Sequence, residues 1–246
     1  QPVLQAQAAG LGTLRSTLDA RLQRRAREAV ATQLAELSGR SVGDAAVLVV
    51  DNRTGEILAW VGSGGEGASA PAVDAVLARR QAGSTLKPFV YQAAFASGWL
   101  TPDSALDDSP AQIPTGAGLW RPQNYDYHHR GWVTARTALA SSFNVPAVRV
   151  AQLVGLEPLH RHLQAVGLEL DQPPGHYGLS LALGSADVTL LALTNAYRTL
   201  ANGGRWTPLT LHAPADNAGT RAHRAVLPPA GRAGAAASAS LGADPG

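Results

Sequence analysis

The sequence predicts a mixed α/β domain, and three observations point to it. An amphipathic helical pattern comes first, an apolar β-hairpin follows, and helical segments separated by polar breaks fill most of the remainder. The 246 residues are enough for one large domain or two small ones. Because 45% of them are apolar and 15% charged, the chain can bury a sizeable core, which excludes a disordered chain.

The first element is an amphipathic helix predicted over residues 14–37. Apolar side chains recur there at every fourth position, which places them on one face. Either Thr17 or Asp19 can cap its start, and the pair Ser38–Gly39 can end it. The arginines of this segment largely occupy the other faces, where a solvated surface explains them better than nucleic-acid binding.

A β-hairpin is predicted next. Two β-rich runs, residues 45–50 and 56–62, flank a short polar turn that ends in Gly55. The first run is almost continuously apolar, which is typical of a central strand covered on both faces. We therefore expect residues 45–50 to lie inside a sheet.

The rest of the chain alternates helices with irregular segments. A stretch rich in Pro, Asp, Gly and aromatic residues predicts a long structured loop over 99–132, and the signal is poor from residue 213 onward. The predicted helices, in chain order, are 84–97, 133–141, 145–154, 158–166 and 188–201.

Composition excludes several classes of function. The net charge is only +2, too weak for a nucleic-acid-binding surface, so we expect no nucleic-acid partner. The chain has no cysteine, which excludes disulfides, thiolate metal sites and a cysteine nucleophile. The histidine pairs at 128–129 and 160/162 have no cluster of carboxylates beside them, so we expect neither a metal nor a cofactor.

The first chemical motif is Ser84-Thr85-Leu86-Lys87, which contains the only lysine of the chain. A spacing of three at a helix start puts the hydroxyl and the amine one turn apart on one face. Backbone N–H groups at such a start can stabilise a developing oxyanion. The amine can remove the proton of the serine only when neutral, which requires its pKa to fall by roughly 3 units through burial. The pattern alone is also typical of a capping serine beside a surface lysine.

A second polar motif, Ser142-Phe143-Asn144, lies between two predicted helices. A short turn there would present a hydroxyl and a carboxamide on the same side. These groups could hydrogen-bond a neutral lysine, relay a proton and orient a substrate amide. The alternative is an ordinary polar turn, in which Asn144 merely ends a helix.

Together, the two motifs resemble the transpeptidase domain of penicillin-binding proteins, of the class A type known as 1C. The resemblance runs from about residue 13 to 204, more faintly to 246. It is carried by the segments Gly83–Phe89, Asp51–Gly62, Pro122–Asp126 and Leu139–Val148. It implies the penicillin-binding/β-lactamase-like transpeptidase fold, in which an antiparallel sheet is flanked by helices and accompanied by an all-helical lobe. Here that fold would be truncated, with a linker at 1–12 and an incomplete domain at 13–246.

The resemblance also implies a role for each site residue. Ser84 would be the acylated nucleophile, Lys87 its general base, Ser142 a partner in proton transfer, and Asn144 a substrate-binding group. The substrate would be the D-Ala-D-Ala end of a peptidoglycan stem peptide, which β-lactams imitate. The site would face the periplasm at the bacterial inner membrane, and an N-terminal glycosyltransferase domain and a membrane anchor would lie outside this chain.

One departure from the family pattern has consequences. The third motif, Lys-Thr/Ser-Gly on a late strand, is absent because no lysine follows Lys87. We therefore expect these 246 residues alone to be inactive and poorly folded, because the hairpin at 45–62 is left with an unpaired edge and uncovered apolar faces. Two alternatives stay open: a D,D-carboxypeptidase or β-lactamase-like hydrolase, and a catalytically dead scaffold that binds cell-wall partners.

Overall fold

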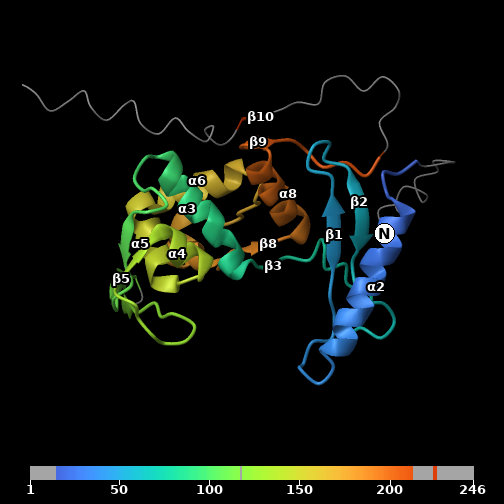
Figure 1. Ribbon diagram of the computed structural model, residues 1–246, viewed down its shortest axis with the longest axis horizontal. Helices are drawn as coiled ribbons and strands as arrows, with labels where there is room; N and C mark the ends of the chain where they lie inside the picture. Colours follow the sequence, from blue (N-terminus) through green and yellow to red (C-terminus); the bar gives the residue numbers. More distant parts are fainter. Residues whose placement is uncertain (1–14, 117, 213–223, 226–246) are drawn as a thin grey trace, which may run out of the picture. The chain divides into compact units, whose positions relative to one another are not determined.

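The computed structural model describes residues 15–116, 118–212 and 224–225 (Figure 1). These residues form two compact units. The hairpin unit comprises the described residues up to 79 together with 189–212 and 224–225, and the helical unit comprises the described residues from 80 to 188. Both units combine helices with antiparallel strand pairs, so the α/β class predicted from the sequence is confirmed. The predicted linker at 1–12 and the stretch from 213 onward, apart from residues 224 and 225, lie outside the described residues.

The hairpin unit begins with helix α2, Ala20–Glu36. Asp19 is its N-cap: the side-chain carboxylate accepts the backbone N–H groups of Arg21 and Leu22, each at 2.8 Å. The helix therefore starts later than the predicted residue 14. Its apolar face packs on the hairpin, and the members of this small core are Leu22, Ala26, Val30, Leu34, Ala45, Val47, Val49, Ala59 and Val61.

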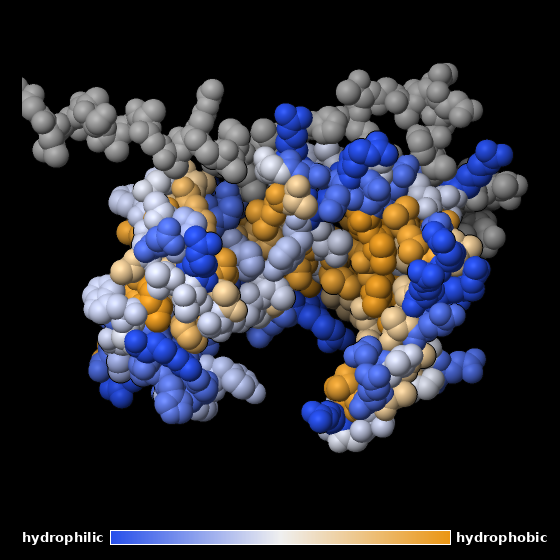
Figure 2. Space-filling view, viewed as in Figure 1, coloured by the Kyte–Doolittle hydropathy of each residue, from blue (hydrophilic) through white to orange (hydrophobic). Residues whose placement is uncertain are grey.

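The predicted hairpin consists of β1, Val47–Val50, and β2, Ile57–Val61, which pair antiparallel. Within the described residues β1 pairs with β2 alone, and all four of its residues are half-buried. The expectation of a central strand is therefore wrong for this structure, whereas the unpaired hairpin edge expected from the absent third motif is present in the described residues. Apolar side chains alone could not distinguish a central strand from an edge strand, because the distinction depends on partners distant in sequence. Figure 2 shows apolar surface over this hairpin.

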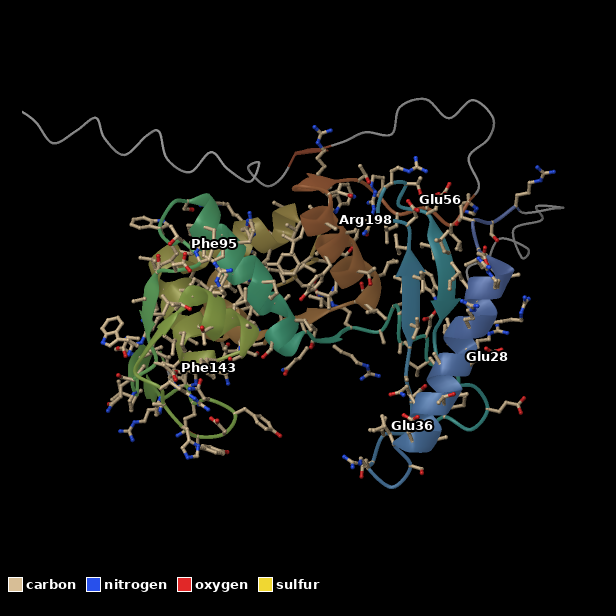
Figure 3. All side chains as sticks on the ribbon, in the orientation of Figure 1. Glu28, Glu36, Glu56, Phe95, Phe143 and Arg198 are labelled. Carbon is tan, nitrogen blue, oxygen red and sulfur yellow. The ribbon has the colours of Figure 1, made fainter. Side chains whose placement is uncertain are left out.

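Helix α8, Leu190–Ala201, completes the hairpin unit together with β9, Arg205–Trp206, and β10, Arg224–Ala225. Arg198 projects from α8 and is almost fully buried (Figure 3). Its guanidinium donates to the Asn52 carbonyl at 2.9 Å, to the Thr207 carbonyl at 3.0 Å and to the Thr207 hydroxyl at 2.6 Å. One side chain thus ties α8 to the hairpin turn and to the segment after β9.

The helical unit is built around α3, Lys87–Ala96, and α5, Asn144–Val154, which pack against each other. The other helical elements of this unit are η1 (Gly83–Leu86), α4 (Ala135–Ala140), α6 (Leu156–Ala165), α7 (Pro174–Tyr177) and η2 (Gly178–Leu183). The largest apolar or aromatic side chains of its core are fully buried: Leu86, Phe89, Tyr91, Leu159, Leu163, Leu168 and Leu181. Of these helical elements, α7 and η2 were not predicted, because both are short and begin at Pro or Gly.

The segment predicted as a structured loop, 99–132, contains short strands rather than helices. Strands β4 (Ala105–Asp107) and β7 (Trp132–Thr134) pair antiparallel, as do β5 (Ile113–Thr115) and β6 (Gly118–Trp120). A further short pair joins β3, Arg80–Gln81, to β8, Asp187–Val188. No helix in the described part of the chain is both long and apolar enough to cross a bilayer.

Candidate active site

Ser84 lies in a tight turn just before α3. The turn is the 3₁₀-helix η1, and the α-helix proper begins only at Lys87. The reason is local: in an α-helix the N–H of residue 88 would bond the Ser84 carbonyl, but Pro88 has no N–H. The N–H of Lys87 bonds that carbonyl instead, one residue earlier. The predicted helix 84–97 is thus confirmed in position, and its first turn differs in type. Ser84 itself is exposed.

The end of η2, about 100 residues later in the sequence, contacts this turn. The backbone N–H of Gly83 donates to the carbonyl of Gly184 at 3.0 Å. Gly184 has φ +78°, and a Cβ there would stand 2.0 Å from the Gly83 carbonyl oxygen. Only glycine therefore allows the end of η2 to support the residue that precedes Ser84.

Lys87 is fully buried, with three oxygen partners around its amine. The Nζ atom lies 2.5 Å from the carbonyl oxygen of Ser142, 3.0 Å from the Ser142 hydroxyl and 2.6 Å from Oδ1 of Asn144. Burial lowers the pKa of Lys87 to about 8. About one lysine in ten is then neutral at pH 7, a usable fraction for a general base.

Ser142 occupies a strained position at the end of α4. Its N–H bonds the Leu139 carbonyl at 3.0 Å, and the N–H of Phe143 bonds the Ala138 carbonyl at 2.9 Å. This pair of bonds is the Schellman helix ending, in which the residue at the position of Ser142 is usually glycine. Ser142 has φ +55°, so it bears the cost of a left-handed backbone and keeps a hydroxyl beside Lys87.

Asn144 is the first residue of α5. Its carboxamide is used at both ends: Oδ1 accepts from Lys87, and Nδ2 donates to the Gln123 carbonyl at 2.8 Å. A backbone carbonyl can only accept, which fixes the carboxamide with its oxygen toward the lysine. Phe143, labelled in Figure 3, marks the turn that joins α4 to this helix.

The structure thus brings three of the four candidate residues into direct contact: Lys87, Ser142 and Asn144. Ser84 stands one turn before Lys87 in the same unit, and within the described residues no hydrogen bond joins their side chains. Gly184 and two buried polar residues, Asn124 and Asp108, were not predicted as site residues. The block 122–126 contributes to the family resemblance, but no local pattern in it indicates its contacts. Across the described ranges, no group of three or more His, Asp and Glu could hold a metal ion.

Comparison with known proteins identifies the family of this chain. The family model "Penicillin binding protein transpeptidase domain" matches residues 45–226. Penicillin-binding protein 1A of Rickettsia felis is 39% identical over 176 residues, which cover 70% of this chain and 21% of the relative. Penicillin-binding protein 1A of Neisseria cinerea is 35% identical over 163 residues, covering 65% of this chain and 20% of the relative. The chain therefore spans about a fifth of the length of these relatives.

The solved structures agree. The crystal structure of penicillin-binding protein 1A from Haemophilus influenzae superposes with a TM-score of 0.63 at 31% identity, over 70% of this chain and 25% of that one. A peptidoglycan glycosyltransferase structure from Burkholderia ambifaria has a TM-score of 0.70 at 19% identity, covering 86% of this chain and 69% of that one, and shows the fold alone. The Rickettsia and Neisseria relatives are both of the 1A type, whereas the flanking motifs resemble the 1C type. With the family model spanning most of its length, the chain belongs to the penicillin-binding protein transpeptidase domain family.

Proposed function

We propose that this chain carries the acylation site of a serine D,D-transpeptidase, with Ser84 as the nucleophile and Lys87 as its general base. The observation that carries the proposal is the buried Lys87 amine, held by two oxygens of Ser142 and one of Asn144. An exposed serine stands one helical turn before it. The substrate class is the D-Ala-D-Ala end of a peptidoglycan stem peptide, and β-lactams acylate the same hydroxyl.

The partners of Lys87 suggest how the proton moves. The Ser142 carbonyl and Oδ1 of Asn144 can only accept, so a neutral amine donates its two N–H bonds to them. Its lone pair is then left for a hydroxyl: that of Ser142 before substrate binds, and that of Ser84 once substrate is bound. After protonation the amine can pass a proton to the Ser142 oxygen. Ser142 is thereby able to relay a proton to and from Lys87. Catalytic hydrogen bonds often form only once substrate is bound. We therefore expect the Ser84 hydroxyl to bond the Lys87 amine in the complex with substrate.

The proposed reaction has two steps. Oγ of Ser84 attacks the carbonyl of the penultimate D-Ala, its proton passes to Lys87, and an acyl ester forms as the peptide C–N bond breaks. The proton returns through Ser142 to the departing amine of D-Ala. An amine on a neighbouring stem peptide then attacks the ester, which forms the cross-link and restores the Ser84 hydroxyl. The second Nδ2 hydrogen of Asn144, beside the one that Gln123 accepts, donates to the substrate amide, and the N–H groups of the η1 turn face the developing oxyanion.

Because these 246 residues lack the third motif, we expect them to undergo the proposed acylation slowly. In the family pattern the strand that bears Lys-Thr/Ser-Gly supplies a second oxyanion donor. Loss of one such donor costs about 10²–10³ in rate. Extending the chain with that strand from a relative is expected to speed acylation by about that factor.

The same proposal locates the reaction at the periplasmic face of the bacterial inner membrane, since peptidoglycan is cross-linked there. Attachment to the membrane would come from a segment outside these 246 residues. The relatives' name, penicillin-binding protein 1A, supports the penicillin partner.

Labelling with a fluorescent penicillin tests the proposal. In the chain extended with the Lys-Thr/Ser-Gly strand of a relative, we expect mass spectrometry to find one adduct, at Ser84, and expect Ser84→Ala to abolish it. The 246 residues alone should label far more slowly. Lys87→Ala and Ser142→Ala should slow it strongly, whereas Ser141→Ala, at the neighbouring exposed hydroxyl, should match the wild type. An adduct at another residue, or undiminished labelling of Lys87→Ala, would refute the assignment. Rapid release of hydrolysed penicillin would instead identify a hydrolase.

A further inference from the structure

The orientation of Asn144 depends on more than its own helix. Its side chain reaches Lys87 through Oδ1, and its backbone N–H belongs to the first turn of α5, which has no intrahelical acceptor. Such N–H groups are usually capped by the side chain just before the helix. Here that residue is Phe143, which cannot accept a hydrogen bond.

Asn124 supplies the missing cap from a loop 20 residues earlier. Its Oδ1 accepts the N–H of Asn144 at 2.8 Å and that of Val145 at 3.4 Å. The preceding residue, Gln123, accepts the side-chain amide of Asn144 through its carbonyl. One dipeptide therefore binds both the backbone and the side chain of Asn144.

The side-chain amide of Asn124 is in turn hydrogen-bonded to a buried carboxylate. Its Nδ2 donates to both oxygens of Asp108, at 2.8 and 2.9 Å, and to the carbonyl of His128 at 2.8 Å. Asn124 is 3% exposed and Asp108 0%, so these bonds form away from solvent. The Asp108 carboxylate also accepts the N–H of Arg130 at 2.9 Å. Because a carboxylate accepts only, this network fixes the Asn124 amide with its oxygen toward α5.

We propose that Asn124 is a positioning residue for acylation: anchored by Asp108, it holds Asn144 so that Oδ1 faces the Lys87 amine. The proposal rests on the proposed role of Lys87. It makes the loop 121–131 part of the acylation machinery, although neither Asn124 nor Asp108 touches Lys87. Arg130 supports the same arrangement, since its guanidinium lies 4.7 Å from the centre of the Phe143 ring.

A double-mutant cycle separates positioning from simple stabilisation. We expect Asn124→Ala to slow penicillin acylation at least 10-fold in the wild-type background and less than 2-fold in the Asn144→Ala background, because its effect passes through Asn144. The matched control is Thr189→Ala, which removes the N-cap of α8 in the hairpin unit and should change the rate less than 2-fold in both. The same loss in both backgrounds for Asn124→Ala would overturn the proposal.

The single lysine gives a second readout that needs no reaction. In the 246-residue chain labelled with ¹³C,¹⁵N-lysine, the side-chain signal reports Lys87 alone. Asn124→Ala should move the pH midpoint of this signal in the same direction and by a similar amount as Asn144→Ala, and Thr189→Ala should leave it in place. Should Asn124→Ala fail to fold, Asp108→Asn keeps the shape and part of the hydrogen bonding, and should give a smaller shift in the same direction. A wild-type signal in every folded variant of Asn124 and Asp108 refutes the positioning role. Undiminished acylation of Lys87→Ala refutes only the proposed function.

Discussion

Two features of its surroundings act on the protonation of Lys87 in opposite directions. It is fully buried, which disfavours the ammonium form, and it is surrounded by oxygens that favour it. Burial dominates, and the pKa of Lys87 falls to about 8 rather than to an extreme value. A lysine in this range can both take a proton and return it near neutral pH.

The rate of acylation should therefore rise with pH. Because the base is the neutral amine, the rate constant should rise about tenfold per pH unit below 7, bend near pH 8 and level off above it. Penicillin labelling between pH 6 and 10 measures it. Lys87→Arg, which retains the charge but cannot be deprotonated, should be inactive at every pH. A flat profile would contradict the role of Lys87 as base.

Ser142 keeps a hydroxyl beside Lys87 in a backbone conformation that favours glycine. Its φ of +55° costs about 1 kcal/mol relative to glycine. We expect Ser142→Gly to slow acylation at least 10-fold and to change the free energy of unfolding by less than about 1 kcal/mol, because relief of the left-handed backbone is offset by loss of the hydroxyl that contacts the buried Lys87 amine. The control is Ser41→Gly, at φ +56° on an exposed residue of the hairpin unit, which should raise the free energy of unfolding by about 0.5–1 kcal/mol with unchanged acylation. Urea unfolding and penicillin labelling measure the two effects, and a folded Ser142→Gly variant with full acylation would count against Ser142.

At the scale of elements, helix ends position the site. The 3₁₀ turn at η1, the Schellman ending of α4 and the start of α5 each present one of the candidate site residues. Each arises where regular helical hydrogen bonding is interrupted, by Pro88 in the first case and by the left-handed Ser142 in the second. Interrupted hydrogen bonding leaves side chains and backbone N–H groups available for chemistry.

The contact of η2 with η1 can be tested with one methyl group. In Gly184→Ala the new Cβ would collide with the Gly83 backbone and would also strain a φ of +78°. We expect a loss of about 2–4 kcal/mol in unfolding free energy and acylation at least 10-fold slower in the folded fraction. Gly98→Ala, at φ +71° in the Schellman ending of α3 with nothing within 4 Å of its Cβ, has the backbone strain alone and should lose about 1 kcal/mol with little change in acylation. Equal effects of the two substitutions would contradict the role of the contact.

At the scale of the whole molecule, each unit has its own core and its own buried polar group. In the hairpin unit that group is Arg198, whose bonds to Asn52 and Thr207 close the unit around the hairpin turn. The helical unit buries the Asn124–Asp108 pair in the same way. Buried polar groups with all their partners in place specify a unique arrangement of the core. Removing one partner leaves a buried group without its hydrogen bond, which destabilises the fold.

Acid should destabilise the folded chain through His162. This side chain is half-buried, its Nε2 has no hydrogen-bond partner within the described residues, and burial lowers its pKa from 6.5 to about 4. Between these two values the unfolded chain binds the proton and the folded chain does not, so stability falls as the pH drops from about 6.5 to 4. The loss is at most about 3 kcal/mol.

Urea unfolding between pH 4 and 7.5 measures this dependence. His162→Leu should flatten the slope, whereas His176→Gln, at an exposed histidine, should retain it. An unchanged slope in His162→Leu would assign the acid sensitivity to other groups.

The sequence by itself determined the features that depend on residues close together in the chain. Hydrophobic period, caps and turns placed the first helix, the hairpin and most later helices, and the three-residue spacing of Ser84 and Lys87 put both groups at one helix start. The two motifs also pointed to the family, which the comparisons confirm.

Only the tertiary structure decided how these pieces meet. Lys87 and Ser142 are 55 residues apart, Gly83 and Gly184 more than 100, and Asn124 reaches a helix that starts 20 residues later. No local pattern encodes such pairings, because a hydrogen bond or a close backbone approach depends on where folding brings two distant segments. For the same reason the edge position of β1 and the burial that lowers the pKa of Lys87 could not be predicted from their own residues.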